Sequence, residues 1–158
     1  MKKGIISIVS AIAGAATGAG VTAKQITKET KRQKELADKH LTLYLMMNQW
    51  VKVKQENRSI ADYLEKNGYK EIAIYGMNYV GETLLNELAG SGVNVKYAID
   101  RNADNIYTDV DIVVPDVSME KVDAIIVTPV TFFDEIEEML SEKTDCPILS
   151  MEDILYEV

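Results

Sequence analysis

The stretch from Glu71 to Asp100 constrains the fold more than any other part of this sequence. A short apolar run at residues 72–75 ends at Gly76, and a helical pattern begins within four residues of that glycine. A second β-rich run at residues 93–99 ends at the carboxylate of Asp100. This order of strand, tight glycine turn, helix and strand predicts a βαβ unit, in which a helix joins two parallel strands.

The same alternation continues after this unit. The later patterns are apolar runs at residues 112–114, 122–127 and 147–149, and helical runs at residues 132–141 and 151–156, the last with Ser150 as its N-cap. Short strands that alternate with helices predict an α/β domain over residues 69–158. We expect a single three-layer sandwich with about five parallel strands in the order 3-2-1-4-5. A chain of 158 residues has room for one such core and a helical extension before it.

The extension is predicted to contain a helical connector at residues 24–68. No glycine or proline lies between Thr27 and Gln55, which predicts one long helix or two in series. The apolar residues within 36–53 cover too wide an arc for a helix surrounded by water. They are expected to be covered by the chain's own sheet, by a second copy in a homodimer, or by another protein, and Trp50 is expected in the core.

A second, shorter helix is predicted between this connector helix and the first strand. Ser59 has the preferred side chain of an N-cap, and Asn67 and Gly68 end the helical pattern.

The amino terminus carries a run without any charged residue at residues 4–23, long enough for a helix to cross a bilayer. We expect residues 1–23 to be a membrane anchor. A cleaved signal peptide and a soluble helix or flexible tail are the alternatives, because the run is rich in small residues. More cations follow the run than precede it, which predicts that the domain faces the cytoplasm, associated with the membrane.

Charge is divided unevenly along the chain. Residues 1–40 carry eight basic and three acidic residues, a balance of +5, whereas residues 41–158 carry nine and twenty-two, a balance of −13. The acidic part is expected to repel nucleic acid. Cys146 and His40 are the only cysteine and histidine, so the sequence predicts neither an intramolecular disulfide nor a zinc site.

The glycine turn is typical of a phosphate-binding turn, with one departure. Gly76 and Gly81 hold the first and third positions of a G-x-G-x-x-G pattern, but Asn78 stands at the second, where its side chain would take space from a pyrophosphate. Asp100 follows Gly81 by nineteen residues, the spacing at which an acid binds ribose hydroxyls, and Arg101 lies beside it.

These residues resemble the NAD(P)-binding Rossmann superfamily. The segment IAIYGMNYVG is similar to its glycine-turn strand, and VDAIIVTPV is similar to the fourth strand of sugar oxidoreductases. The run from about Trp50 is also similar to small bacterial Rossmann-like modules of polysaccharide and glycan biosynthesis. The resemblance implies a Rossmann-like fold and a pocket for a nucleotide, either NAD or a nucleotide-sugar. It gives the expected binding residues Gly76, Met77, Asn78, Tyr79, Val80, Gly81, Asp100 and Thr128. Arg101, which lies beside Asp100, and Pro129, in the loop after the strand at residues 122–127, are expected to bind as well.

The sequence gives no catalytic constellation. No tyrosine is followed four residues later by a lysine, as in short-chain dehydrogenases, and His40 lies in the connector. We therefore expect a membrane-associated module that binds a nucleotide or nucleotide-sugar without catalysis of its own. It is expected to pass this ligand to a glycan-biosynthesis partner, or to sense the ligand for that partner. The alternatives are an NAD-dependent oxidoreductase or epimerase subunit that completes its site across an oligomer interface, and a scaffold for protein contacts that binds no ligand.

Overall fold

The computed structural model describes residues 2–115 and 119–158, and for residues 2–25 and 105 it describes the backbone alone. The chain forms two units, residues 1–43 and residues 44–158. Helix α1 (Lys2–Gln55) is one continuous helix, which settles the choice between one helix and two. The membrane anchor predicted at residues 4–23 lies outside the residues whose side chains are described. Among the described residues, no helix is long and apolar enough to cross a membrane.

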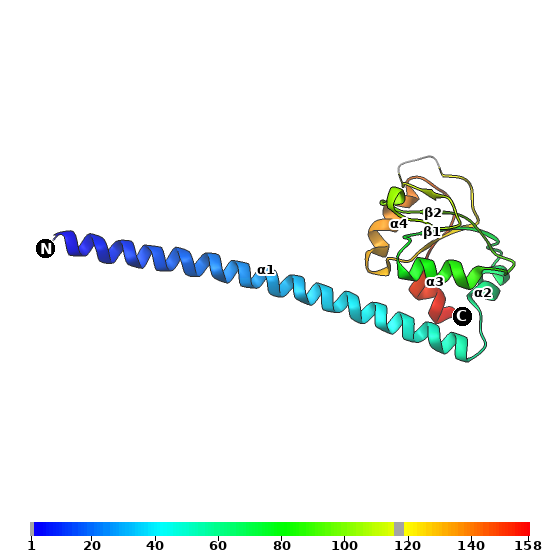
Figure 1. The fold of residues 1–158 in the computed structure, drawn as a ribbon, viewed down its shortest axis with the longest axis horizontal. Helices are drawn as coiled ribbons and strands as arrows, with labels where there is room; N and C mark the ends of the chain where they lie inside the picture. The colour runs from blue at the N-terminus through cyan, green and yellow to red at the C-terminus, as the bar shows by residue number, and fades with distance from the viewer. Residues whose placement is uncertain (1, 116–118) are drawn as a thin grey trace. The chain divides into compact units, whose positions relative to one another are not determined.

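A single sheet of five parallel strands forms the centre of the second unit (Figure 1). Its strands are β1 (Glu71–Tyr75), β2 (Asn94–Ile99), β3 (Ile112–Val113), β4 (Ala124–Val127) and β5 (Ile148–Ser150). They lie in the order β3-β2-β1-β4-β5, which confirms the predicted α/β fold and strand order. The central strands are apolar on both faces because helices cover both faces.

Helices cover the two faces of the sheet unequally. Helix α4 (Phe133–Ser141) packs on one face, where Ile136 and Leu140 join the core cluster formed by Ala73, Tyr75, Tyr97, Ile99, Ile125 and Val127. Helices α3 (Tyr79–Leu88) and α5 (Met151–Glu157) lie on the opposite side of the sheet from α4 (Figure 1). The two remaining short elements are the 3-10 turns η1 (Ala103–Asn105) and η2 (Val130–Phe132).

The end of α1 packs on this domain. Met46, Trp50 and Val53 are buried, so within the predicted dimer segment 36–53 one face is covered by the chain itself, and the expectation that Trp50 belongs to the core is confirmed. The indole N–H of Trp50 donates to a carboxylate oxygen of Glu87 on α3. The other sides of the same helix segment carry exposed apolar residues: Tyr44, Leu45, Met47 and Val51. Within the first unit, α1 also exposes Ile26, Leu36 and Leu41.

Helix α2 (Ile60–Lys66) has the predicted N-cap. The Ser59 hydroxyl accepts from the backbone N–H of Asp62 at 3.4 Å, and Gly68 follows the helix with φ +84°. Ser150 likewise stands at the N-cap of α5, but its side chain makes no capping hydrogen bond.

A carboxylate ties the first residues of β1 to the start of β4. Asp123 accepts from the backbone N–H of Lys70 at 2.9 Å and from that of Glu71 at 2.7 Å. These two bonds hold the pKa of Asp123 below its usual value, since they favour the charged form. Asp123 therefore fixes the register of two central strands at their amino ends.

Candidate functional site

The carboxyl ends of β1, β2 and β4 meet at one edge of the sheet. Tyr75 pairs with Ile99 on one side and with Val127 on the other. The residues that follow these strands, Gly76, Asp100 and Thr128, are therefore brought together, as their sequence positions predict. In open parallel sheets this edge is where ligands bind.

The turn after β1 requires glycine at position 76 for two reasons. Gly76 has φ +90°, a backbone conformation that L side chains rarely adopt. A Cβ atom there would also lie 2.7 Å from Cγ of Pro129. The turn is fastened by the fully buried Thr128, whose hydroxyl donates to the Gly76 carbonyl oxygen at 2.6 Å.

Gly81 lets helix α3 approach this turn. A Cβ atom at position 81 would lie 2.2 Å from the Gly76 carbonyl oxygen, far inside any real contact. Two positions of the glycine pattern therefore have the roles expected of them: Gly76 makes the turn, and Gly81 allows the helix to pack against it.

Asn78, at the second position of the pattern, is the N-cap of α3. Its side-chain oxygen accepts from the backbone N–H of Val80 at 2.8 Å and from that of Gly81 at 3.2 Å. These are N–H groups that have no partner inside the helix and that a bound phosphate uses in phosphate-binding turns. The protein therefore satisfies both donors with its own side chain.

Asp100 connects β2 to the glycine turn. One carboxylate oxygen accepts from the backbone N–H of Met77 at 2.9 Å, and the other accepts from that of Asn102 at 2.8 Å. Asp100 is half-buried, so it keeps an accessible side. A carboxylate offers about four acceptor positions, so this one can still accept hydrogen bonds from a ligand.

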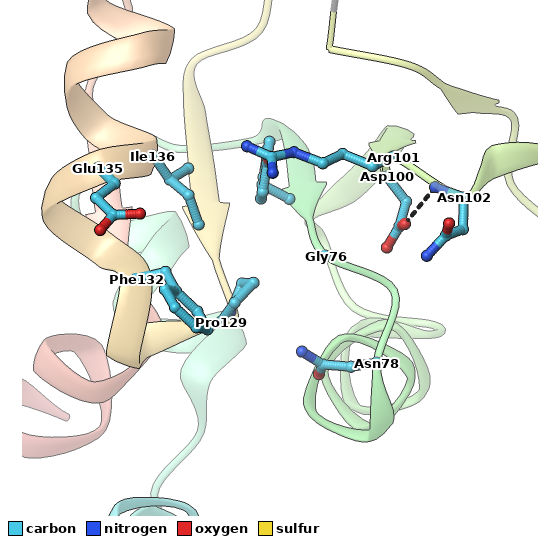
Figure 2. Close-up of a pocket in the computed structure, with 10 residues that line it drawn as sticks. Gly76, Asn78, Asp100, Arg101, Asn102, Pro129, Phe132, Glu135 and Ile136 are labelled. Atoms are coloured by element: carbon cyan, nitrogen blue, oxygen red, sulfur yellow. Dashed lines mark hydrogen bonds between the residues drawn. The ribbon is translucent and has the colours of Figure 1, made fainter. Parts of the chain in front are cut away.

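A pocket of about 330 Å³ opens beside Asp100, between the ends of β1 and β2 and helix α4. Figure 2 shows Arg101 reaching from the end of β2 toward α4, with Pro129 and Phe132 at the other side of the opening. The complete lining is Tyr75, Gly76, Asn78, Asp100, Arg101, Asn102, Pro129, Phe132, Glu135 and Ile136. The volume is near the lower end of the range for small-molecule sites.

Tyr75 gives the pocket a polar group on its inner wall. The residue is 4% exposed, and its hydroxyl has no hydrogen-bond partner among the residues that the structure describes. No buried side-chain oxygen of those residues is left without a partner, so the Tyr75 hydroxyl has some contact with solvent, and Tyr75 is one of the residues that line the pocket. It can donate to or accept from a bound molecule.

Half of the predicted binding residues line this pocket: Gly76, Asn78, Asp100, Arg101 and Pro129. The other half do not. Met77 and Val80 turn into the core, Gly81 packs on the turn, Thr128 is buried beneath it, and the Tyr79 side chain is 88% exposed.

The sequence reasoning missed Tyr75, Asn102, Phe132, Glu135 and Ile136. Tyr75 carried a usable signal, because it is the last residue of a buried strand and a tyrosine there places a hydroxyl at the ligand edge. Phe132 and Ile136 are four residues apart after Pro129, a spacing that puts two apolar side chains on the same side of a helix beginning there.

No model of a protein family matches the chain, and no curated protein or solved structure does.

Proposed function

We propose that residues 44–158 bind a ligand of the nucleoside class, a nucleotide or a nucleotide-sugar, and hold it without transforming it. The observation that supports this most is the Asp100 carboxylate. It is fixed at the end of β2 by two backbone N–H groups and still borders the pocket. A fixed acceptor with free lone pairs suits a pair of neighbouring ribose hydroxyls, which are both donors.

The rest of the pocket suits a planar base. Pro129, Phe132 and Ile136 supply an apolar side, and Phe132 is 48% exposed there. Arg101 approaches from the end of β2, across the opening from Phe132, and a guanidinium can stack on an aromatic ring. A nucleoside is the ligand that combines a diol with a flat aromatic ring in this way.

The residues around the pocket favour binding of a ligand over catalysis on that ligand. Asp100 is held by backbone N–H groups rather than by a titratable side chain, and Glu135 lies on the exposed surface of α4. A general acid or base needs a positioned proton partner, and the described lining offers no hydrogen-bonded pair of titratable side chains.

Ligand-induced thermal stabilisation of the full chain tests this function. We expect at least one of NAD, NADP, UDP-glucose and S-adenosylmethionine at millimolar concentration to raise the Tm, and Asp100→Asn to abolish the rise. Asp104→Asn, an exposed acid outside the pocket lining, is the matched control and should leave the rise unchanged. If none of these compounds stabilises the protein, the proposal fails.

Membrane association and a glycan-biosynthesis partner belong to the same proposal and are supported by the sequence alone. The uncharged run at residues 4–23 and the basic residues after it support membrane association, and the resemblance of the run from about Trp50 to glycan-biosynthesis modules supports the partner. Recovery of the full chain in the soluble fraction without detergent would refute the anchor.

A homodimer through α1 is supported by exposed apolar side chains. Within residues 44–51, Tyr44, Met47 and Val51 lie at helical spacing and are exposed beside the face that packs on the domain. We expect Met47→Glu to convert a dimer into a monomer in analytical ultracentrifugation, whereas Gln55→Glu at the end of the helix should not. A monomeric wild-type protein would refute this part.

A further inference from the structure

We infer that the pocket recognises the nucleoside part of its ligand alone, because Asn78 occupies the place of a phosphate at the glycine turn. Any phosphate on the ligand then extends away from α3 and adds little to the affinity. This inference rests on the proposed function and narrows it, since a dinucleotide held through its pyrophosphate is excluded.

The geometry of Asn78 is the first reason. Both of its contacts, with the N–H groups of Val80 and Gly81, are hydrogen bonds to one side-chain oxygen. A phosphate could reach the same N–H groups only by displacing that oxygen. The ligand would then have to offset the loss of a helix cap, and Asn is among the best capping residues.

The rigidity of the turn is the second reason. Gly76 and Gly81 are in direct backbone contact, and Thr128 binds the same Gly76 carbonyl from below. The Asp100 carboxylate holds the N–H of Met77 on the other side. Because each of these groups is already engaged, the turn cannot change its conformation to offer other N–H groups to a phosphate.

The charge of the lining is the third reason. Asp100 and Glu135 are acidic, and Arg101 is the one basic residue in the described lining. A pyrophosphate would therefore enter a pocket with an excess of negative charge, in a domain that is itself acidic.

The Tyr75 hydroxyl is the fourth reason and points to the ligand. It is a neutral polar group on a residue that is 4% exposed, and it lacks a partner among the described residues. Such a group is suited to a base edge or a hydroxyl, both of which are neutral and belong to a nucleoside. The interior of the pocket is thus built for uncharged polar groups.

Calorimetric titration of the full chain with matched pairs tests the inference: adenosine against ADP, and uridine against UDP. Within each pair the nucleoside is the same and only the pyrophosphate differs. For the pair that binds, we expect the two Kd values to agree within about threefold. A phosphate held by two backbone N–H groups would instead tighten binding by roughly tenfold or more.

Asn78→Gly is the informative variant, because it frees the two N–H donors while glycine remains an acceptable N-cap. We expect it to tighten binding of the diphosphate by about tenfold and to leave the nucleoside within about threefold of wild type. Asn86→Gly, the same change at an exposed position of the same helix, controls for loss of helix stability and should alter neither Kd. Circular dichroism confirms that both variants are folded.

The outcomes separate this inference from the proposed function. A wild-type protein that binds ADP or UDP at least tenfold more tightly than the nucleoside overturns the inference and leaves the function standing. An Asn78→Gly protein that gains no affinity for the diphosphate also overturns it. If neither member of either pair binds, the proposed function fails, and the inference fails with it.

Discussion

The substitution Gly81→Ala sets two physical effects against each other at the centre of the site. Gly81 lies inside α3, where helix propensity alone favours alanine over glycine by about 1 kcal/mol. The new methyl group, however, would lie 2.2 Å from the Gly76 carbonyl oxygen. That oxygen belongs to a backbone turn fastened by Thr128, so it cannot move aside as a flexible side chain would. Overpacking against a fixed group costs about 3 kcal/mol, so we expect a net destabilisation of about 2 kcal/mol or more.

Thermal unfolding followed by circular dichroism measures this effect. A loss of about 2 kcal/mol lowers the Tm of a domain of this size by roughly 6–12 °C. Gly90→Ala is the control: Gly90 has φ +78° but no atom within 4 Å of the added Cβ, so only backbone strain of about 1 kcal/mol is expected. A Gly81→Ala protein with a Tm equal to or above that of wild type would show that propensity wins and that α3 does not contact the turn as described.

Two further predictions concern the attachment of α1 and the strand register. Glu87→Ala should lower the unfolding free energy by about 2 kcal/mol, because it leaves the N–H groups of Trp50 and Ile60 without their acceptor. The fluorescence of Trp50, the only tryptophan, should shift to the red, and an unchanged spectrum would contradict the packing of α1. Asp123→Ala should lower the Tm at pH 7. Because the folded-state pKa of Asp123 is lowered, its contribution is complete above the unfolded pKa of about 3.9 and is lost as the pH falls through the folded value. The Tm difference from wild type should therefore shrink below about pH 4, and a difference that grows there would refute this.

The sheet could be predicted from the sequence because its signals are local. Each strand is a short apolar run bounded by polar or glycine residues, and strands that alternate with helices have few allowed topologies. The strand order and the single long helix α1 follow the patterns closely. Strand ends differ by one or two residues. For example, the predicted run begins at residue 122, whereas β4 begins at Ala124.

The pocket could be predicted only on the side that the glycine turn and Asp100 form. Its other side comes from α4, and which residues of a helix face a pocket depends on how the helix docks on the sheet. No local pattern encodes that docking, which is why Phe132, Glu135 and Ile136 were missed. Thr128 shows the opposite case: its position at the end of β4 was informative, but its hydroxyl serves the turn rather than the pocket.

The most direct test of a nucleoside site beside Asp100 is a map of backbone amide chemical shifts in the full chain during titration with adenosine and with uridine. We predict that one of them shifts the amides of Gly76, Met77, Arg101 and Asn102, which surround the carboxylate. A second pocket of about 410 Å³, lined mainly by residues 85–95, lies at the other end of β2 and provides the comparison. Shifts confined to residues 85–95, or no shifts at millimolar nucleoside, would contradict the account.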